Sequence, residues 1–155
     1  MNSVPEVTIT KDGDAIVNEK NLHISNIEIV EYIDKGQCGY LLKGKERFVD
    51  RTVAVKLYDN KFFVSDEVRN QGLSEVKKAV GLEHSNIVRV LSSNIDDHGR
   101  YYVVMEYLDG KTMEDYLNEQ NPSFKQRINY WDAITSGLHH AHSRDVWHGD
   151  LHLRN

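Results

Sequence analysis

The pattern of apolar and polar positions divides the chain into a strand-rich part followed by a helical part. Short stretches rich in β-branched residues predict strands at residues 7–9, 27–33, 53–58, 87–92 and 101–108. One helix is predicted between the third and fourth of these strands, from an N-cap at Ser65 to about Leu82. Asp66 and Glu67 stand in its first turn, where acidic side chains complement the helix dipole.

After Gly110 the spacing of apolar residues becomes helical. Thr112 with Asp115 predicts the capped start of a short helix, and Ser123 with Gln126 forms a capping box. One long amphipathic helix then follows from the spacing of Phe124, Ile128, Trp131, Ile134, Leu138 and Ala141. The sequence therefore predicts an α+β fold with two unequal lobes, joined by a connector at residues 106–110.

Composition and charge limit the function classes. The chain has 155 residues, enough for one domain with a real core, and a net charge of −5. It has no lysine or arginine run that would bind a phosphate backbone, so a nucleic-acid partner is not expected. With Cys38 as the single cysteine, no intrachain disulfide can form. The N-terminus lacks the apolar stretch of a signal peptide, and no apolar run reaches membrane-spanning length. We expect a cytoplasmic protein without a membrane segment.

Two glycines, Gly36 and Gly39, lie between the predicted strand that ends at Ile33 and another predicted strand that starts at Tyr40. Glycine has no Cβ, so backbone N–H groups at such a turn can approach phosphate oxygens closely. The pattern taken alone fits an ordinary hairpin turn equally well.

A strand lysine and a helix glutamate form the next candidate site. Ala54 and Lys56 are two residues apart on a predicted strand, so both point to one face. Glu75 shares a helix face with the small or apolar Val68 and Ala79, which should pack inward. A carboxylate in that position needs a partner, although a solvated helix residue is the alternative.

A third candidate site follows the long helix. His148 and Asp150 are followed by Asn155, five residues after the aspartate. A loop of this length lets the carboxylate and the amide point into one cleft, whereas the alternative is a solvated loop with no shared function. Together with the two preceding features, this order is typical of protein kinases.

Residues 28–155 resemble the first part of a protein kinase catalytic domain. The resemblance implies an antiparallel five-stranded N-lobe sheet with one inserted helix, a hinge, and the start of a helical C-lobe. The implied division is an N-terminal extension with a short hairpin at 1–26, the N-lobe and hinge at 27–108, and a partial C-lobe at 109–155.

The resemblance also implies roles for particular residues. Asp150 would accept the hydroxyl proton of a protein substrate, Lys56 and Glu75 would position ATP, and Asn155 would bind Mg²⁺. The implied nucleotide-binding residues are Ile33, Gly36, Gly39, Leu41, Ala54, Lys56, Met105, Glu106 and Leu108. The expected activity is ATP-dependent transfer to serine or threonine.

Three residues depart from the family pattern. Asp34 replaces a glycine near the expected phosphates, and Gly149 replaces an arginine that many kinases pair with a phosphorylated segment. His152 replaces a lysine that steadies the transferred phosphate, while Arg154 is a candidate for the missing positive charge. Two alternatives therefore stay open. One is a pseudokinase or nucleotide-binding regulatory module, and the other is a small-molecule phosphotransferase.

The Asp-Phe-Gly triplet that kinases place after the catalytic loop does not occur in these 155 residues. We therefore expect the isolated chain to have little or no phosphotransfer activity. We also expect the apolar stripe of the long helix to be exposed and to favour self-association.

Overall fold

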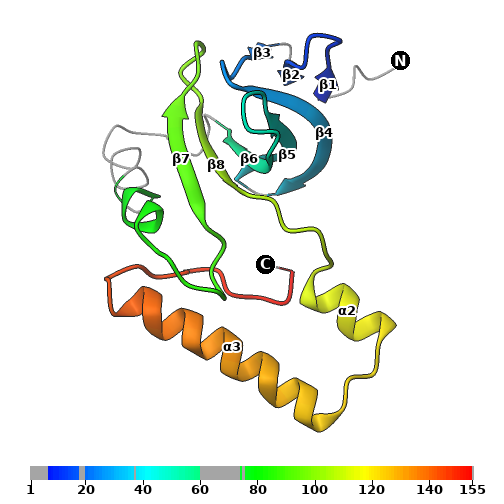
Figure 1. Cartoon of the computed structure of the whole chain (residues 1–155), viewed down its shortest axis with the longest axis vertical. Coiled ribbons are helices and arrows are strands. Elements are labelled where there is room, and N and C mark those ends of the chain that lie inside the picture. Colours follow the sequence, from blue (N-terminus) through cyan, green and yellow to red (C-terminus); the bar gives the residue numbers. More distant parts are fainter. Residues whose placement is uncertain (1–6, 18–19, 37, 60–73, 75, 155) are drawn as a thin grey trace.

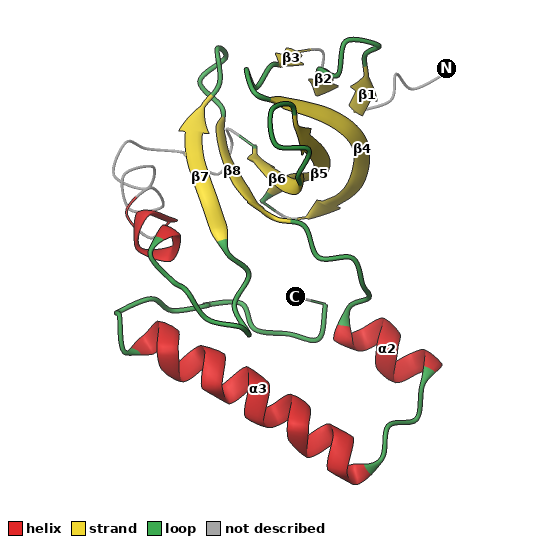
Figure 2. Ribbon diagram, in the orientation of Figure 1, coloured by secondary structure: helices red, strands yellow, loops and turns green. Residues whose placement is uncertain are grey.

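The computed structural model describes residues 7–17, 20–36, 38–59, 74 and 76–154. Its described residues form a five-stranded sheet, a smaller three-stranded sheet stacked on it, and helices on the far side of a connector (Figure 1). The two helices beyond the connector are α2 (Met113–Glu119) and α3 (Phe124–His142) (Figure 2). The predicted α+β architecture is confirmed.

The larger sheet is antiparallel throughout, with the strand order β4-β5-β6-β8-β7. Its strands are β4 (Ile27–Gly36), β5 (Gly39–Glu46), β6 (Thr52–Tyr58), β7 (Val90–Ile95) and β8 (Tyr101–Glu106). All five predicted strands of the N-lobe are therefore present, but the predicted ends of β4 and β8 and both predicted ends of β7, which continues to Ile95, were wrong. The strand β4 continues past Ile33 because Lys35 and Gly36 pair with Tyr40 and Gly39 across the hairpin.

The start of β7 and the end of β8 moved for local reasons. The strand β7 starts at Val90 because residues 84–87 form a turn, in which the Ile87 amide donates to the His84 carbonyl at 3.1 Å. The strand β8 ends at Glu106, so Leu108 belongs to the connector. The predicted helix before β7 is described as helical at residues 74 and 76–80 and ends two residues before the predicted Leu82, and its predicted N-cap Ser65 lies outside the described residues.

The three-stranded sheet is formed by β1 (Val7–Ile9), β2 (Ala15–Val17) and β3 (Lys20–Leu22), all antiparallel. The sequence predicted a short hairpin here, and the structure adds a third strand. The strand β1 also contacts β4, and the Ile29 amide donates to the Gly13 carbonyl at 2.7 Å. The N-terminal strands are therefore joined to the larger sheet by backbone contacts.

The main core lies between the two sheets. Its buried members are Ala15, Val17, Leu22, Ile24, Ile27, Ile29, Tyr40, Leu42, Val53, Val55, Leu57, Tyr102 and Val104. Because side chains alternate along a strand, the residues between Val53, Val55 and Leu57 point the other way. The outer face of the larger sheet is thus covered by β1–β3, and Ala54 and Lys56 belong to the opposite face.

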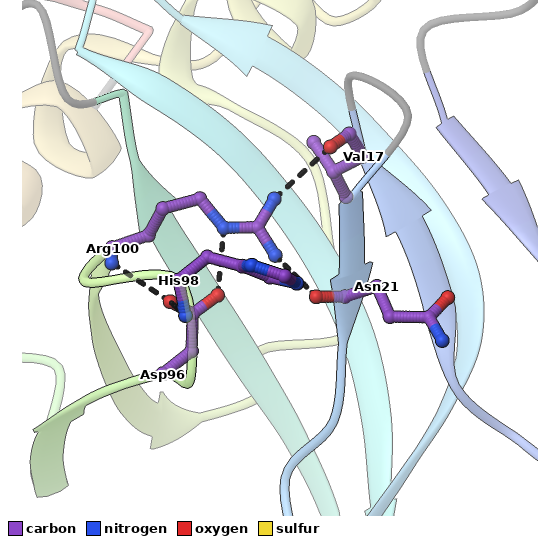
Figure 3. A network of polar contacts seen from close by, with 5 residues as sticks. All are labelled: Val17, Asn21, Asp96, His98 and Arg100. Carbon is purple, nitrogen blue, oxygen red and sulfur yellow. Dashed lines mark hydrogen bonds and ion pairs between the residues drawn. The ribbon is translucent and has the colours of Figure 1, made fainter.

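A buried arginine links the two sheets (Figure 3). Arg100, in the turn before β8, forms an ion pair with Asp96 at 2.6 Å, and the two side chains are only 7% and 1% exposed. Its guanidinium also donates to the Val17 carbonyl at 3.0 Å and to the Asn21 carbonyl at 2.7 Å. One side chain therefore connects the β7–β8 hairpin to both β2 and β3.

The helices begin where the sequence predicted. Thr112 caps α2 by accepting from the Asp115 amide at 3.1 Å, and Ser123 forms a capping box with Gln126 at the start of α3. The expected apolar stripe of α3 is exposed at Phe124, Ile128 and Trp131, whereas its later members Ile134, Leu138 and Ala141 are partly buried. No helix in the described part of the chain is long and apolar enough to cross a membrane.

Candidate active site

The face of the larger sheet opposite the core carries four of the predicted nucleotide-binding residues. Ala54 on β6 pairs with Lys43 on β5 and with Met105 on β8. In the next row of the same face, Lys56 pairs with Leu41 and Val103. Directly opposed residues of antiparallel strands share a face, so Leu41, Ala54, Lys56 and Met105 lie on one face of the sheet.

Lys56 is half-buried and lies beside an aromatic ring. Its ammonium is 5.1 Å from the centre of the Tyr58 ring. Burial, with smaller effects of Tyr101 and Cys38, raises the pKa of Tyr58 to about 12, so this ring stays neutral at physiological pH. The predicted partner Glu75 lies outside the described residues, and the Lys56–Glu75 pair therefore remains a prediction.

The glycine-rich hairpin connects β4 to β5 at the edge of this face. Gly39 has φ of +149°, and a Cβ added there would lie 2.0 Å from the Leu57 carbonyl oxygen. Only glycine fits that approach of β5 to β6. At Gly36 an added Cβ would meet no described atom within 4 Å, which leaves open space beside the backbone. Ile33, also in β4, is 38% exposed.

Asp34 stands in the same hairpin, with an exposed side chain. Its carboxylate accepts a hydrogen bond from the Lys35 amide at 2.7 Å. Its negative charge is also one of the effects that raise the pKa of Arg154.

The connector after β8 is fixed by Glu106. Its carboxylate accepts from the Arg89 amide at 2.7 Å, and its own amide donates to the Arg89 carbonyl at 3.0 Å. Tyr107 follows, with its ring 4.5 Å from the Lys43 ammonium. A hydrogen bond to Tyr107 is the main cause that raises the pKa of Lys43. Leu108 is 63% exposed.

The loop after α3 runs back along the helix and ends beside the start of α2 (Figure 1). Asp150 lies in this loop with its side chain 83% exposed, and its Oδ2 is 3.6 Å from Nε2 of His152. The Asp150 amide donates to Nδ1 of His148 at 3.4 Å. Asn155 lies outside the described residues, so its predicted contact with a metal ion remains untested.

Glu114 is a contact residue of this loop that sequence reasoning missed. Its amide donates to the Leu153 carbonyl at 2.9 Å, and its carboxylate accepts from Nε of Arg154. These contacts hold the end of the loop against the first turn of α2. Glu114 stands in that first turn, where acids are common at any helix N-terminus, so its sequence position carried no signal of a loop contact.

Comparison with known proteins assigns this arrangement to a family. The model of the protein kinase domain matches residues 27–155. The chain belongs to the protein kinase family. Relatives of this kinase domain include the serine/threonine-protein kinase PrkC of Bacillus subtilis, which is 29% identical over 129 residues, covering 83% of this chain and 20% of that protein. The probable serine/threonine-protein kinase PknB of Lactococcus lactis is 31% identical over 133 residues, covering 82% of this chain and 20% of that protein.

Solved structures support the fold of the kinase domain. The PknI kinase domain of Mycobacterium tuberculosis matches with a TM-score of 0.74 and 20% identity, covering 86% of this chain and 55% of that one. The predicted kinase-like fold is therefore confirmed. The chain spans about a fifth of the length of the curated relatives it matches, so substrates and partners of a whole protein are not fixed by these matches.

Proposed function

We propose that this kinase domain binds ATP and contributes to phosphoryl transfer to serine or threonine hydroxyls of a protein substrate. The observation that carries the proposal is the placement of Lys56 beside Ala54, Leu41 and Met105 on the sheet face opposite the core. A cation among small and apolar side chains suits a ligand that has both a flat ring and a charged chain.

The residues present fit such a nucleotide. Ala54 is a small side chain between its cross-strand neighbours Lys43 and Met105, which suits a planar base, and the open side of Gly36 would admit phosphate oxygens near the backbone. Lys56 supplies positive charge for those phosphates. The Glu106 carbonyl and the Leu108 amide, in the connector, would meet the polar edge of the base.

Asp150 would serve the acceptor side of the reaction. A bound ATP with Mg²⁺ supplies the transferable phosphoryl group, and Asn155 would hold the metal ion. Asp150 is an exposed carboxylate, so it can orient an acceptor hydroxyl and accept its proton as the oxygen attacks. The partner expected from this chemistry is a protein that presents serine or threonine.

One observation favours a second candidate function. The exposed carboxylate of Asp34 stands in the hairpin that would cover the phosphates. Like charges would weaken nucleotide binding, and this is the property of a regulatory pseudokinase. His152 in place of the family's lysine keeps a small-molecule phosphotransferase as a further alternative.

Thermal unfolding with and without Mg-ATP tests the proposal. A ligand at about 100 times its Kd stabilises a protein by about 2.7 kcal/mol, so the wild-type melting temperature should rise. Lys56→Met should remove most of that rise. Lys45→Met is the matched control, because Lys45 is an exposed residue of β5 paired with Asp50, and it should keep the full rise.

Two results would count against the proposal. One is a wild-type melting temperature that Mg-ATP leaves unchanged, and the other is an equal rise in Lys56→Met. Transfer of the γ-phosphoryl group to a serine peptide, measured in this chain and in any longer protein that contains it, separates the enzyme from the pseudokinase. Asp150→Asn should abolish transfer while leaving nucleotide stabilisation intact.

A further inference from the structure

Glu114 contacts the loop of Asp150 through two different atoms. Its backbone amide donates to the Leu153 carbonyl, and its carboxylate accepts from the Arg154 guanidinium. The carboxylate is also the main cause that raises the pKa of Arg154, ahead of the charges of Asp115 and Asp34. A single residue of α2 therefore holds both Leu153 and Arg154 at the end of the loop.

The contacts continue from Arg154 toward the predicted catalytic carboxylate. The Arg154 amide donates to Nδ1 of His152 at 3.2 Å, so Nδ1 acts as an acceptor and the proton of the neutral ring is on Nε2. That Nε2–H faces Oδ2 of Asp150 at 3.6 Å. The distance exceeds a hydrogen bond, but a small rotation of either exposed side chain would close it, as catalytic contacts often tighten on substrate binding.

We propose that Glu114 is a positioning residue for Asp150, and that it acts through Arg154 and His152. This inference rests on the proposed function, because it gives Asp150 the role of orienting an acceptor hydroxyl. In this loop His152 takes the place of the family's lysine as the donor beside the carboxylate, and α2 holds that donor in place. Because α2 follows the connector directly, the same helix supports both the connector, which would bind the base, and the loop of Asp150.

The competing explanation is an ordinary surface ion pair. The side chains of Glu114 and Arg154 are 37% and 71% exposed, and exposed pairs contribute little to stability. A purely structural pair would leave the rate of transfer unchanged once the protein is folded. The rate of transfer is far more sensitive to the position of Asp150 relative to its substrate, because misplacement by about an ångström can cost on the order of 100-fold in rate.

The first experiment replaces Glu114 and uses the other end of the same helix as control. Glu114→Gln removes the charge and keeps the backbone contact, while Glu119→Gln removes an exposed carboxylate that pairs with Lys111 away from the loop. Amide hydrogen exchange of residues 148–154, measured on the 155-residue chain, should rise about fivefold in Glu114→Gln. It should stay at the wild-type level in Glu119→Gln. Unchanged exchange in both variants overturns the proposal.

A double substitution tests whether Glu114 acts through Arg154. In a longer protein that contains this chain and transfers the phosphoryl group, Glu114→Gln and Arg154→Gln should each lower kcat by about 10-fold with little change in the KM for ATP. The pair together should lower kcat by about the same factor as either alone, because they interrupt one path. Independent effects that multiply would overturn the path.

The last contact is tested with two isosteres of His152. Gln places a donor near the position of Nε2, while Asn places an acceptor near the position of Nδ1. If His152 serves Asp150, His152→Gln should retain kcat within about threefold, and His152→Asn should lose about 10-fold or more. The carboxyl ¹³C resonance of Asp150, which needs no activity, should likewise move in His152→Asn and stay near the wild type in His152→Gln. The reverse order for either readout overturns the proposal.

Nucleotide stabilisation separates this inference from the proposed function. Glu114→Gln and Glu119→Gln should keep the rise in melting temperature with Mg-ATP, because neither residue lies on the face of Lys56. A wild-type chain without that rise refutes the proposed function, while the exchange and ¹³C measurements still decide whether Glu114 positions the loop.

Discussion

Replacing Arg100 tests how the two sheets are held together. Arg100→Met would keep a long apolar stem but leave the carboxylate of Asp96, which is 1% exposed, without its cation. The carbonyls of Val17 and Asn21 would lose their donors as well. Breaking a buried ion pair by removing one partner costs about 3–5 kcal/mol, since the remaining charge stays buried.

This loss is a large part of the stability of a typical domain, which is about 5–15 kcal/mol. Urea unfolding followed by circular dichroism should show the full loss of about 3–5 kcal/mol in the free energy of unfolding. The melting temperature should fall by about 10 °C. The matched control is Arg89→Met, because Arg89 pairs with Glu83 at 3.1 Å on the surface, where the side chains are 59% and 75% exposed. That variant should lose less than about 1 kcal/mol.

A double variant identifies the cause. Arg100→Met with Asp96→Asn removes both charges, and the oxygen of the new amide side chain would still accept the backbone hydrogen bonds from residues 98 and 100 that Asp96 accepts now. The double variant should therefore be more stable than Arg100→Met alone by about 1–2 kcal/mol. An Arg100→Met protein within about 1 kcal/mol of the wild type would refute the reasoning, because the charge of Asp96 would then be compensated elsewhere.

Two further predictions concern the hairpin and α3. Gly39→Ala should destabilise the fold by about 1–3 kcal/mol, because the added Cβ would overlap the Leu57 carbonyl. Gly36→Ala is the control and should leave urea unfolding unchanged. Equal effects of the two substitutions would contradict this prediction. Burial, with the charges of Arg144, His84 and His139, lowers the pKa of His140. Because the pKa of His140 is lower in the folded state, the unfolded chain binds the proton more readily. The contribution of His140 to the free energy of unfolding is therefore complete above about pH 6.5, and it is lost as the pH falls below that value. His140→Gln should flatten the fall of the urea midpoint between about pH 7.5 and about pH 5, and an unchanged slope would contradict this.

The sequence predicted those elements whose signals are local. The helix α3 was placed correctly because a capping box and a long helical period agree on it. The third N-terminal strand, β3, was missed because a three-residue strand is too short to show a period, and its pairing depends on the neighbouring strand β2. The end of β4 was missed because Asp34, Lys35 and Gly36 are poor strand formers that the hairpin register holds in the sheet.

The site divides in the same way. Alternation along β6 placed Ala54 and Lys56 on one face, and the structure adds their cross-strand neighbours. Glu114 and Arg100 could not be found from spacing. Their contacts are made with residues that lie 40 and 83 positions away in the sequence. No local sequence pattern predicts which distant residue a side chain will contact.

The position of β1–β3 has a practical consequence for anyone who expresses this domain. The family match begins at residue 27, yet the apolar side chains of Leu42, Val55 and Val104 are covered by strands that precede it. A protein trimmed to the matched boundary would expose these apolar side chains to water, and it should be recovered mainly as aggregates. Here the unit that folds is larger than the unit that sequence families define.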